Sequence, residues 1–160
     1  MKRVLAAVVV LALGCTVWFG IEAASLSPGD NLALVDTAAT ASVSDEVSDA
    51  VKSVFSYDYA NLARTERAAA EVLTGEAVGQ YQAQFASART RATAEKLVRT
   101  TTVRAVGVRT LRGDSAELLL FLDQQTVAQD GGAPTSSVAQ LAVTAKRVDG
   151  HWKLATLTAL

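Results

Sequence analysis

Cysteine and histidine are almost missing from this chain of 160 residues, which has one of each, Cys15 and His151. The cysteine lies in an apolar N-terminal segment, so the rest of the chain has no thiol nucleophile, disulfide or cysteine metal ligand. A single histidine cannot form the usual zinc spacings. Phosphate-binding glycine loops and the serine elbow of hydrolases are absent as well. The sequence therefore predicts no cofactor and no metal, and His151 is expected to be an exposed strand residue.

Positive charge is not in excess either. The chain has 15 basic and 16 acidic residues, a formal net charge of −1. Arg99, Arg104 and Arg109 follow one predicted strand without a matching set of aromatic residues, so binding to single-stranded nucleic acid is not supported. We expect no nucleic-acid partner.

The N-terminus carries the longest apolar segment. Residues 4–21 contain no charged side chain and directly follow Lys2 and Arg3. As a helix this segment would reach about 27 Å, close to the hydrocarbon thickness of a bilayer. Basic residues on its N-terminal side predict a single-pass anchor in the cell membrane, with a cytoplasmic N-terminus and an extracytoplasmic C-terminal domain.

Two other interpretations of this segment stay open. It could be a cleaved secretory signal, although Glu22 is a poor residue before the small pair Ala23-Ala24. It could also be a lipoprotein signal acylated at Cys15, although the residues after that cysteine continue apolar.

The remaining residues predict one α+β domain. We expect a cytoplasmic tip and transmembrane anchor at residues 1–22, a linker at 23–31 and an extracytoplasmic domain at 32–160. Apolar residues at helical spacing predict a first helix from about residue 31 to 55. Asn61 is the expected N-cap of a second helix and Gly75 its expected end. A third helix is expected over residues 76–93.

The pattern then changes to strands. Residues 100–111 are rich in threonine and valine, with Gly107 as a candidate bulge, and residues 117–127 have apolar residues on both faces. A third strand alternates around residues 139–146, and Asp149-Gly150 predicts a tight hairpin to a fourth. About three helices packed on a curved four-stranded antiparallel sheet, a cone, is the expected fold.

Carboxylates are the remaining acid–base candidates. Asp45, Glu46 and Asp49 fall together on the first helix, where a solvated face is expected. Asp58 lies at a helix junction, where capping is the expected role. Asp123 is expected at the end of a strand. The sequence indicates no catalytic site.

Three blocks together resemble one family. They are residues 55–62 (Phe-Ser-Tyr-Asp-Tyr-Ala-Asn-Leu), residues 73–75 with 80–81, and the ending 147–160 with its Val-Asp-Gly-His-Trp hairpin. With the N-terminal anchor, these blocks resemble the Mce-associated membrane proteins of actinobacteria. Ala159 departs from the pattern, because proline is expected there.

The resemblance implies a cystatin-like or nuclear-transport-factor-2-like cone. It also implies a non-enzymatic accessory protein that stabilises or assembles an Mce-type importer of lipids or sterols, with Mce subunits, permeases and the membrane as partners. The family assigns no role to the matching signature residues Phe55, Tyr57, Asp58 and Tyr59.

Other functions stay open beside this one. The cone could hold a lipid or sterol, with a cavity lined by residues that are equally good core, Phe85, Leu118, Leu120 and Trp152. A SnoaL-like enzyme would need at least two of four side chains to meet in one cavity, from Tyr57, Asp58, Tyr59 and Asp123. A scaffold subunit of a type IV secretion system would share both the anchor and the cone.

Overall fold

The computed structural model describes residues 31–160, which form one unit of their own. The predicted anchor at residues 4–21, Cys15 and the linker up to residue 30 lie outside the described residues. Across residues 31–160, no helix is both long and apolar enough to cross a membrane. The helical elements are η1 (Leu32–Leu34), α2 (Thr37–Phe55), η2 (Tyr59–Asn61), α3 (Leu62–Val72) and α4 (Glu76–Ala94). The strands are β1 (Tyr57–Asp58), β2 (Leu97–Arg112), β3 (Ser115–Ala128), β4 (Thr135–Val148) and β5 (His151–Ala159).

The first predicted helix is divided in two. The Asn31 side chain accepts a hydrogen bond from the N–H of Ala33 and begins a short 3-10 turn. Asp36 then caps α2 by accepting from the N–H of Ala39 at 2.9 Å. The single helix expected from about residue 31 was therefore wrong at its start, because a second capping residue begins a new helix.

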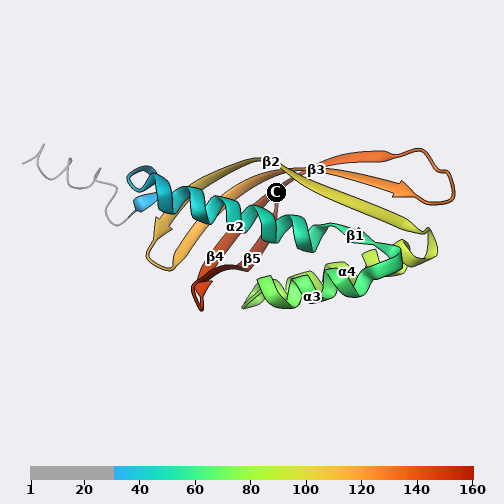
Figure 1. Ribbon diagram of the computed structural model, residues 1–160, viewed down its shortest axis with the longest axis horizontal. Coiled ribbons are helices and arrows are strands. Elements are labelled where there is room, and N and C mark those ends of the chain that lie inside the picture. Colours follow the sequence, from blue (N-terminus) through green and yellow to red (C-terminus); the bar gives the residue numbers. More distant parts are fainter. Residues whose placement is uncertain (1–30) are drawn as a thin grey trace, which may run out of the picture. The chain divides into compact units, whose positions relative to one another are not determined.

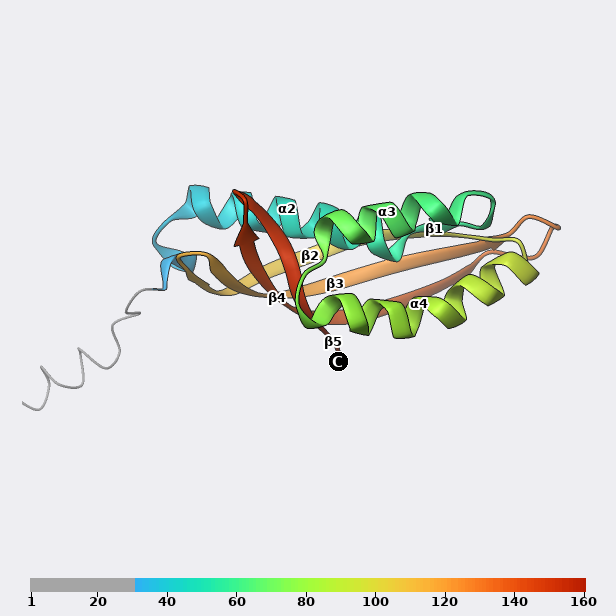
Figure 2. The same ribbon diagram turned by 90° about the horizontal axis from the view of Figure 1, so that it is seen from below.

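The sheet is an antiparallel meander in the order β1-β2-β3-β4-β5. It has five strands, not the expected four, because Tyr57-Asp58 pairs with Arg99 and Val98 of β2. Both α2 and α4 contact β2 and β5, so the sheet curls into a half-barrel around them (Figures 1 and 2). The expected α+β class, three α-helices and curved antiparallel sheet are confirmed.

The turns follow their local sequences. Asp149 and Gly150 have φ values of +53° and +83°, which is the left-handed pair of a tight hairpin, as predicted. The bulges of β2 lie on either side of Gly107, at Val103/Ala105 and Val108/Thr110, and not at the glycine itself.

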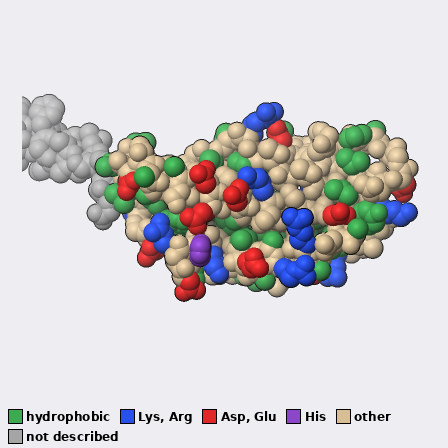
Figure 3. Space-filling model, viewed as in Figure 1, with side chains coloured by type: hydrophobic (Ala, Val, Ile, Leu, Met, Phe, Trp, Pro, Cys, Tyr) green, Lys and Arg blue, Asp and Glu red, His purple; other side chains and the backbone are tan. Residues whose placement is uncertain are grey.

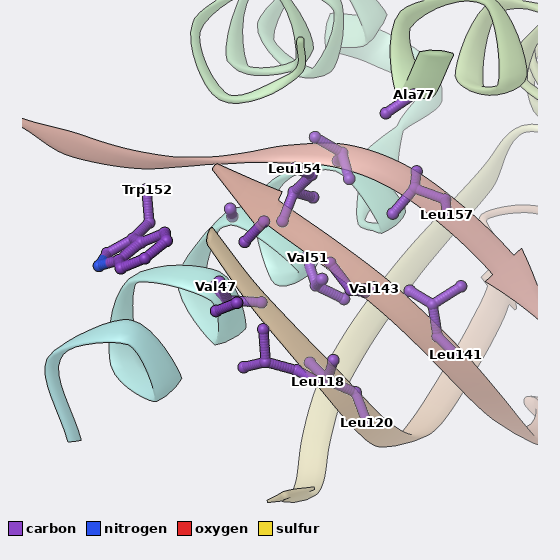
Figure 4. Close-up of a cluster of buried hydrophobic side chains, with 14 of the residues drawn as sticks. Val47, Val51, Ala77, Leu118, Leu120, Leu141, Val143, Trp152, Leu154 and Leu157 are labelled. Atoms are coloured by element: carbon purple, nitrogen blue, oxygen red, sulfur yellow. The ribbon is translucent and has the colours of Figure 1, made fainter. Parts of the chain in front are cut away.

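The main core lies between α2 and the inner face of the sheet. Val43, Val47, Val51 and Val54 of α2 are 0–1% exposed. They face inward residues of β3, β4 and β5, among them Leu120, Val143 and Leu154 (Figure 4). Each buried valine is worth about 1.5–3 kcal/mol relative to an exposed one. The valine stripe of the sequence thus fixes which side of α2 faces the sheet.

Candidate functional site

The signature block forms a joint between the first helix and the sheet. Phe55 ends α2, and its carbonyl accepts the hydroxyl of Thr101 at 2.9 Å. Ser56 accepts the N–H of Thr101 at 3.0 Å through its hydroxyl and the hydroxyl of Thr65 at 3.1 Å through its carbonyl. Both threonines are buried. The block therefore fastens α2 and α3 to the edge of β2.

The acidic residue of this block caps a helix, as expected. The carboxylate of Asp58 accepts the N–H of Ala60 at 2.9 Å and is exposed. Asn61 occupies the N-cap position of α3, as predicted, although its side chain makes no capping hydrogen bond. Gly75 precedes α4 with φ +57° and does not end α3, which closes at Leu73. The turn between α3 and α4 needs glycine just before α4, because the positive φ of Gly75 is unfavourable for residues with a side chain.

Tyr57 belongs to a second, smaller core. It is 7% exposed and packs with Leu62, Ala92 and Leu97, with Tyr59 alongside. Arg99 lies over the Tyr57 ring, 5.2 Å from its centroid, and donates from Nε to the Thr126 hydroxyl at 3.1 Å. Arg99 thus lies half-buried on the inner face of the sheet.

Polar residues of the inner sheet face separate the two cores. They are Arg99 and Thr101 of β2 with Gln124 and Thr126 of β3, joined by hydrogen bonds from Arg99 to Thr126 and from Gln124 to Thr101. Beside them, between α4 and the sheet, lies a hollow of about 270 Å³. Its wall includes the stacked rings of Tyr81 and Phe85, 5.0 Å apart, with Leu122, Leu141 and Leu157. We call this space the inner hollow.

The four predicted cavity residues are divided between this hollow and the core. Phe85 borders the inner hollow. Leu118, Leu120 and Trp152 are 3%, 0% and 3% exposed and belong to the main core (Figure 4). Core packing is the role that the structure gives these three.

Tyr81 carries a buried polar atom without a partner. Its hydroxyl makes no hydrogen bond with any described residue. Burial raises the pKa of Tyr81 well above its usual range, and the negative charge of Glu66 raises it further. Tyr81 is therefore a neutral wall residue of the hollow at any physiological pH.

Of the four candidate acid–base residues, Tyr57 and Asp58 border one hollow of about 690 Å³, and Asp123 lies elsewhere. Asp58 caps a helix at the surface, and Asp123 pairs with Arg104 at 2.8 Å among exposed residues. Asp123 lies within β3 and not at a strand end, because the strand continues to Ala128. Among residues 31–160 no group of three His, Cys, Asp or Glu is placed to hold a metal ion.

The acidic cluster of α2 is solvated in part. Asp45 and Asp49 are exposed, and both signs of charge are interspersed over this face (Figure 3). Glu46 differs, since it accepts the main-chain N–H of Trp152 at 3.1 Å. His151 is exposed on the β5 hairpin, as predicted, and lies 3.9 Å from Glu46.

Hydrogen bonds from other elements occupy several positions on the sheet's edges. On β5, Glu46 accepts from Trp152, Gln80 accepts from Leu157 at 2.8 Å, and the carbonyl of Leu154 accepts from Thr74 at 2.9 Å. On β2, Asn31 accepts the N–H of Leu111 and Ser56 that of Thr101. The main-chain groups with these partners are not available to pair with another strand.

One stretch of β4 has no such protection. Strand β5 pairs with β4 only as far as Leu141↔Ala159, so the β3–β4 hairpin extends beyond it (Figure 1). The Gln140 carbonyl accepts from Leu160, which places its main-chain groups on the β5 side. By the alternation of a strand, those of Val138 and Ser136 face the same open side. Neither has a hydrogen-bond partner there in the described part of the chain, and Val138 is 83% exposed. We call residues 135–140 the open edge.

Comparison by sequence finds distant relatives of the chain. No model of a protein family matches it. Two uncharacterized proteins of Mycobacterium tuberculosis, MT1407 of strain CDC 1551 and Rv1362c of strain H37Rv, are each 30% identical over 125 residues. Each match covers 77% of this chain, which spans 56% of the relative's length. The chain therefore has a mycobacterial relative that is considerably longer.

Solved structures share its fold. An IcmL-like type IV secretion system protein of Legionella pneumophila superposes with a TM-score of 0.64 and 8% identity, over 77% of this chain and 91% of that one. CagV of Helicobacter pylori, a VirB8 homolog, superposes with a TM-score of 0.62 and 12% identity, over 74% and 96% of the two chains. At such identities these likenesses show the fold alone.

Sequence reasoning missed two features, Arg99 and the open edge. Arg99 was considered only as one of three basic residues along the first strand, and its inward position was not recognised. The alternation Leu97, Arg99, Thr101 could have shown it, since all three face the same side. The open edge depends on the lengths of two neighbouring strands, which no local pattern reveals.

Proposed function

We propose that this chain is a non-enzymatic subunit of a transport complex in the cell envelope, where its α+β domain holds other subunits in place. The observation that carries this proposal is the fold, which the chain shares over about three quarters of its length with proteins of type IV secretion systems. The separated positions of Asp58 and Asp123 support a non-catalytic role.

The open edge provides the docking surface in this proposal. An extended segment of a partner can add to an unpaired strand, with main-chain hydrogen bonds giving affinity. Charged side chains and proline are the usual means by which an edge strand avoids such pairing. Residues 135–140 contain neither. Several main-chain groups on the edges of β2 and β5 already have hydrogen-bond partners, whereas Ser136 and Val138 have none on the open side among the described residues.

We further propose that residues 4–21 anchor the chain in the membrane and that the domain works on the extracytoplasmic side. This placement rests on the uncharged segment after Lys2 and Arg3. A tethered domain would hold its open edge at a limited distance from the bilayer, within reach of other membrane subunits.

For the kind of complex, the shared fold favours a scaffold subunit of a secretion-type assembly. A second candidate is an accessory protein of an Mce-type importer of lipids or sterols. The signature block at residues 55–62 favours it, together with a relative from Mycobacterium tuberculosis, which is an actinobacterium.

Co-purification distinguishes these candidates. The tagged full-length chain is extracted from its native membranes in mild detergent, and the bound proteins are identified by mass spectrometry. Recovery of a secretion ATPase and channel subunits supports the secretion-type complex, and recovery of Mce subunits and permeases supports the importer. A chain recovered without any stoichiometric partner would contradict the proposed role.

A further inference from the structure

The inner hollow joins an apolar wall to a positive charge. Its apolar side is formed by Phe55, Tyr81, Phe85, Leu122, Leu141 and Leu157, which come from α2, α4 and three strands. Arg99 lies at one end, beside Tyr57. An apolar surface with one charged group at its end is the complement of an amphiphile.

The charge of Arg99 is not compensated by the described residues. Its Nε donates to the neutral hydroxyl of Thr126, and no carboxylate of residues 31–160 lies within 4.0 Å of its guanidinium. By contrast, Arg104 and Arg109 of the same strand are paired with Asp123 and Glu117. A half-buried guanidinium without a counter-ion is unfavourable, and its planar donors suit a carboxylate.

We propose that the inner hollow binds a single-chain amphiphile with a carboxylate head, a fatty acid. Its chain lies along Phe85, Leu122 and Leu141, and its carboxylate takes two hydrogen bonds from Arg99. The volume of about 270 Å³ is just below the range of about 300–1,000 Å³ typical of ligand sites, which suits one short chain. This binding site is additional to the docking role of the open edge.

A photoactivatable analogue of dodecanoic acid tests the proposal on the purified full-length chain. After illumination, the labelled peptides are identified by mass spectrometry. We expect adducts on the peptides that carry Phe85 and Leu141, and we expect free dodecanoic acid to compete for them. Dodecanol, which lacks the charge, should compete at least tenfold less well, because a charged hydrogen bond contributes about 1.5–3 kcal/mol.

Matched variants assign the head group. Arg99→Gln should reduce labelling about tenfold or more, and Arg99→Lys should restore part of it. Arg104→Gln on the same strand removes an exposed, paired arginine and should leave labelling unchanged. Ala88→Leu, which narrows the hollow from α4, should reduce labelling while Arg99 is intact.

Three results would overturn the proposal. They are equal labelling of Arg99→Gln in a variant with an unchanged unfolding temperature, equal competition by dodecanol, and adducts confined to residues 4–21. None of these readouts uses a partner protein. Failure here therefore leaves the docking role untouched, and failure of co-purification leaves the ligand site untouched.

Discussion

The carboxylate of Glu46 accepts the main-chain N–H of Trp152 at 3.1 Å, although the two residues are 106 positions apart. The other carboxylate oxygen accepts the hydroxyl of Ser42 at 3.1 Å on the same helix. This contact ties α2 to the outermost strand of the sheet. It also closes an edge N–H that another strand could otherwise use.

Removal of this acceptor should destabilise the domain. Glu46→Ala leaves the N–H of Trp152 without a partner, and we expect the free energy of unfolding to fall by about 1 kcal/mol. Glu46→Gln keeps an acceptor oxygen and should lose less. Asp45→Ala, at an exposed neighbour on the same helix, serves as the control and should be neutral. Urea unfolding monitored by tryptophan fluorescence measures all three, and a neutral Glu46→Ala would contradict the assigned contact.

Two glycines should respond to alanine in opposite directions. Gly75 has φ +57° and ψ −134° at the start of α4, a conformation that costs a residue with a side chain about 1–3 kcal/mol. Gly79 lies inside α4, and a Cβ there meets nothing within 4 Å. Gly79→Ala should therefore stabilise the domain by about 0.4–1 kcal/mol, and Gly75→Ala should destabilise it. Equal thermal shifts of the two variants would show that the turn is not as described.

Tyr81→Phe should stabilise the domain. The substitution removes a buried hydroxyl that has no hydrogen-bond partner among the described residues, and we expect a gain of about 1 kcal/mol at pH 7. Denaturant unfolding of the two proteins provides the comparison. A loss of more than about 1 kcal/mol would mean that the hydroxyl has a partner.

The same residue predicts a dependence on alkaline pH. The pKa of Tyr81 is raised by burial in the folded state, whereas the unfolded chain releases this proton near pH 10. The stability that the neutral hydroxyl contributes is therefore complete below pH 10 and decreases as the pH rises toward the raised pKa. The free energy of unfolding of Tyr81→Phe should therefore fall less than that of the unsubstituted protein between pH 9 and pH 11.

The predicted topology can be tested by cysteine labelling, because Cys15 is the one cysteine of the chain. In a Cys15→Ser background, Asp130→Cys in the β3–β4 loop should react with a membrane-impermeant maleimide in spheroplasts, whose cytoplasmic membrane is intact. Lys2→Cys in the same background should react only after lysis. Labelling of the second cysteine before lysis, or of the first only after it, would reverse or reject the proposed orientation.

Much of the fold could be predicted, because strong periodic patterns in the sequence specify most of its helices and strands. The valine stripe of α2 and the Asp149-Gly150 hairpin appear in the sequence as they do in the structure. Strand β1 could not be predicted, because two residues show no period and their pairing with β2 depends on a contact across the fold. The separation of η1 from α2 was missed as well. Asp36 cannot be distinguished in the sequence from a polar residue inside a helix, because only its capping hydrogen bond shows that a new helix begins there.

The candidate site was harder to predict than the fold. Phe55 and Tyr57 were identified by resemblance, and the structure gives their block a mechanical role at the joint of α2 with β2. The inner hollow is bordered by Tyr57 of the smaller core and by Leu122 and Leu141 of the main core, so it is a property of packing and not of any single segment. Arg99 could be identified as a candidate binding residue only once the apolar residues beside it in the hollow were known.

The measurement that tests the proposed function most directly is co-purification of an open-edge variant. Val138→Pro removes a main-chain N–H that faces the open side, so the domain should still fold. The control Val138→Thr changes the exposed side chain but keeps that N–H. We predict that Val138→Pro loses its partner proteins from native membranes while Val138→Thr retains them. Full recovery of partners by a folded Val138→Pro chain would contradict docking at this edge.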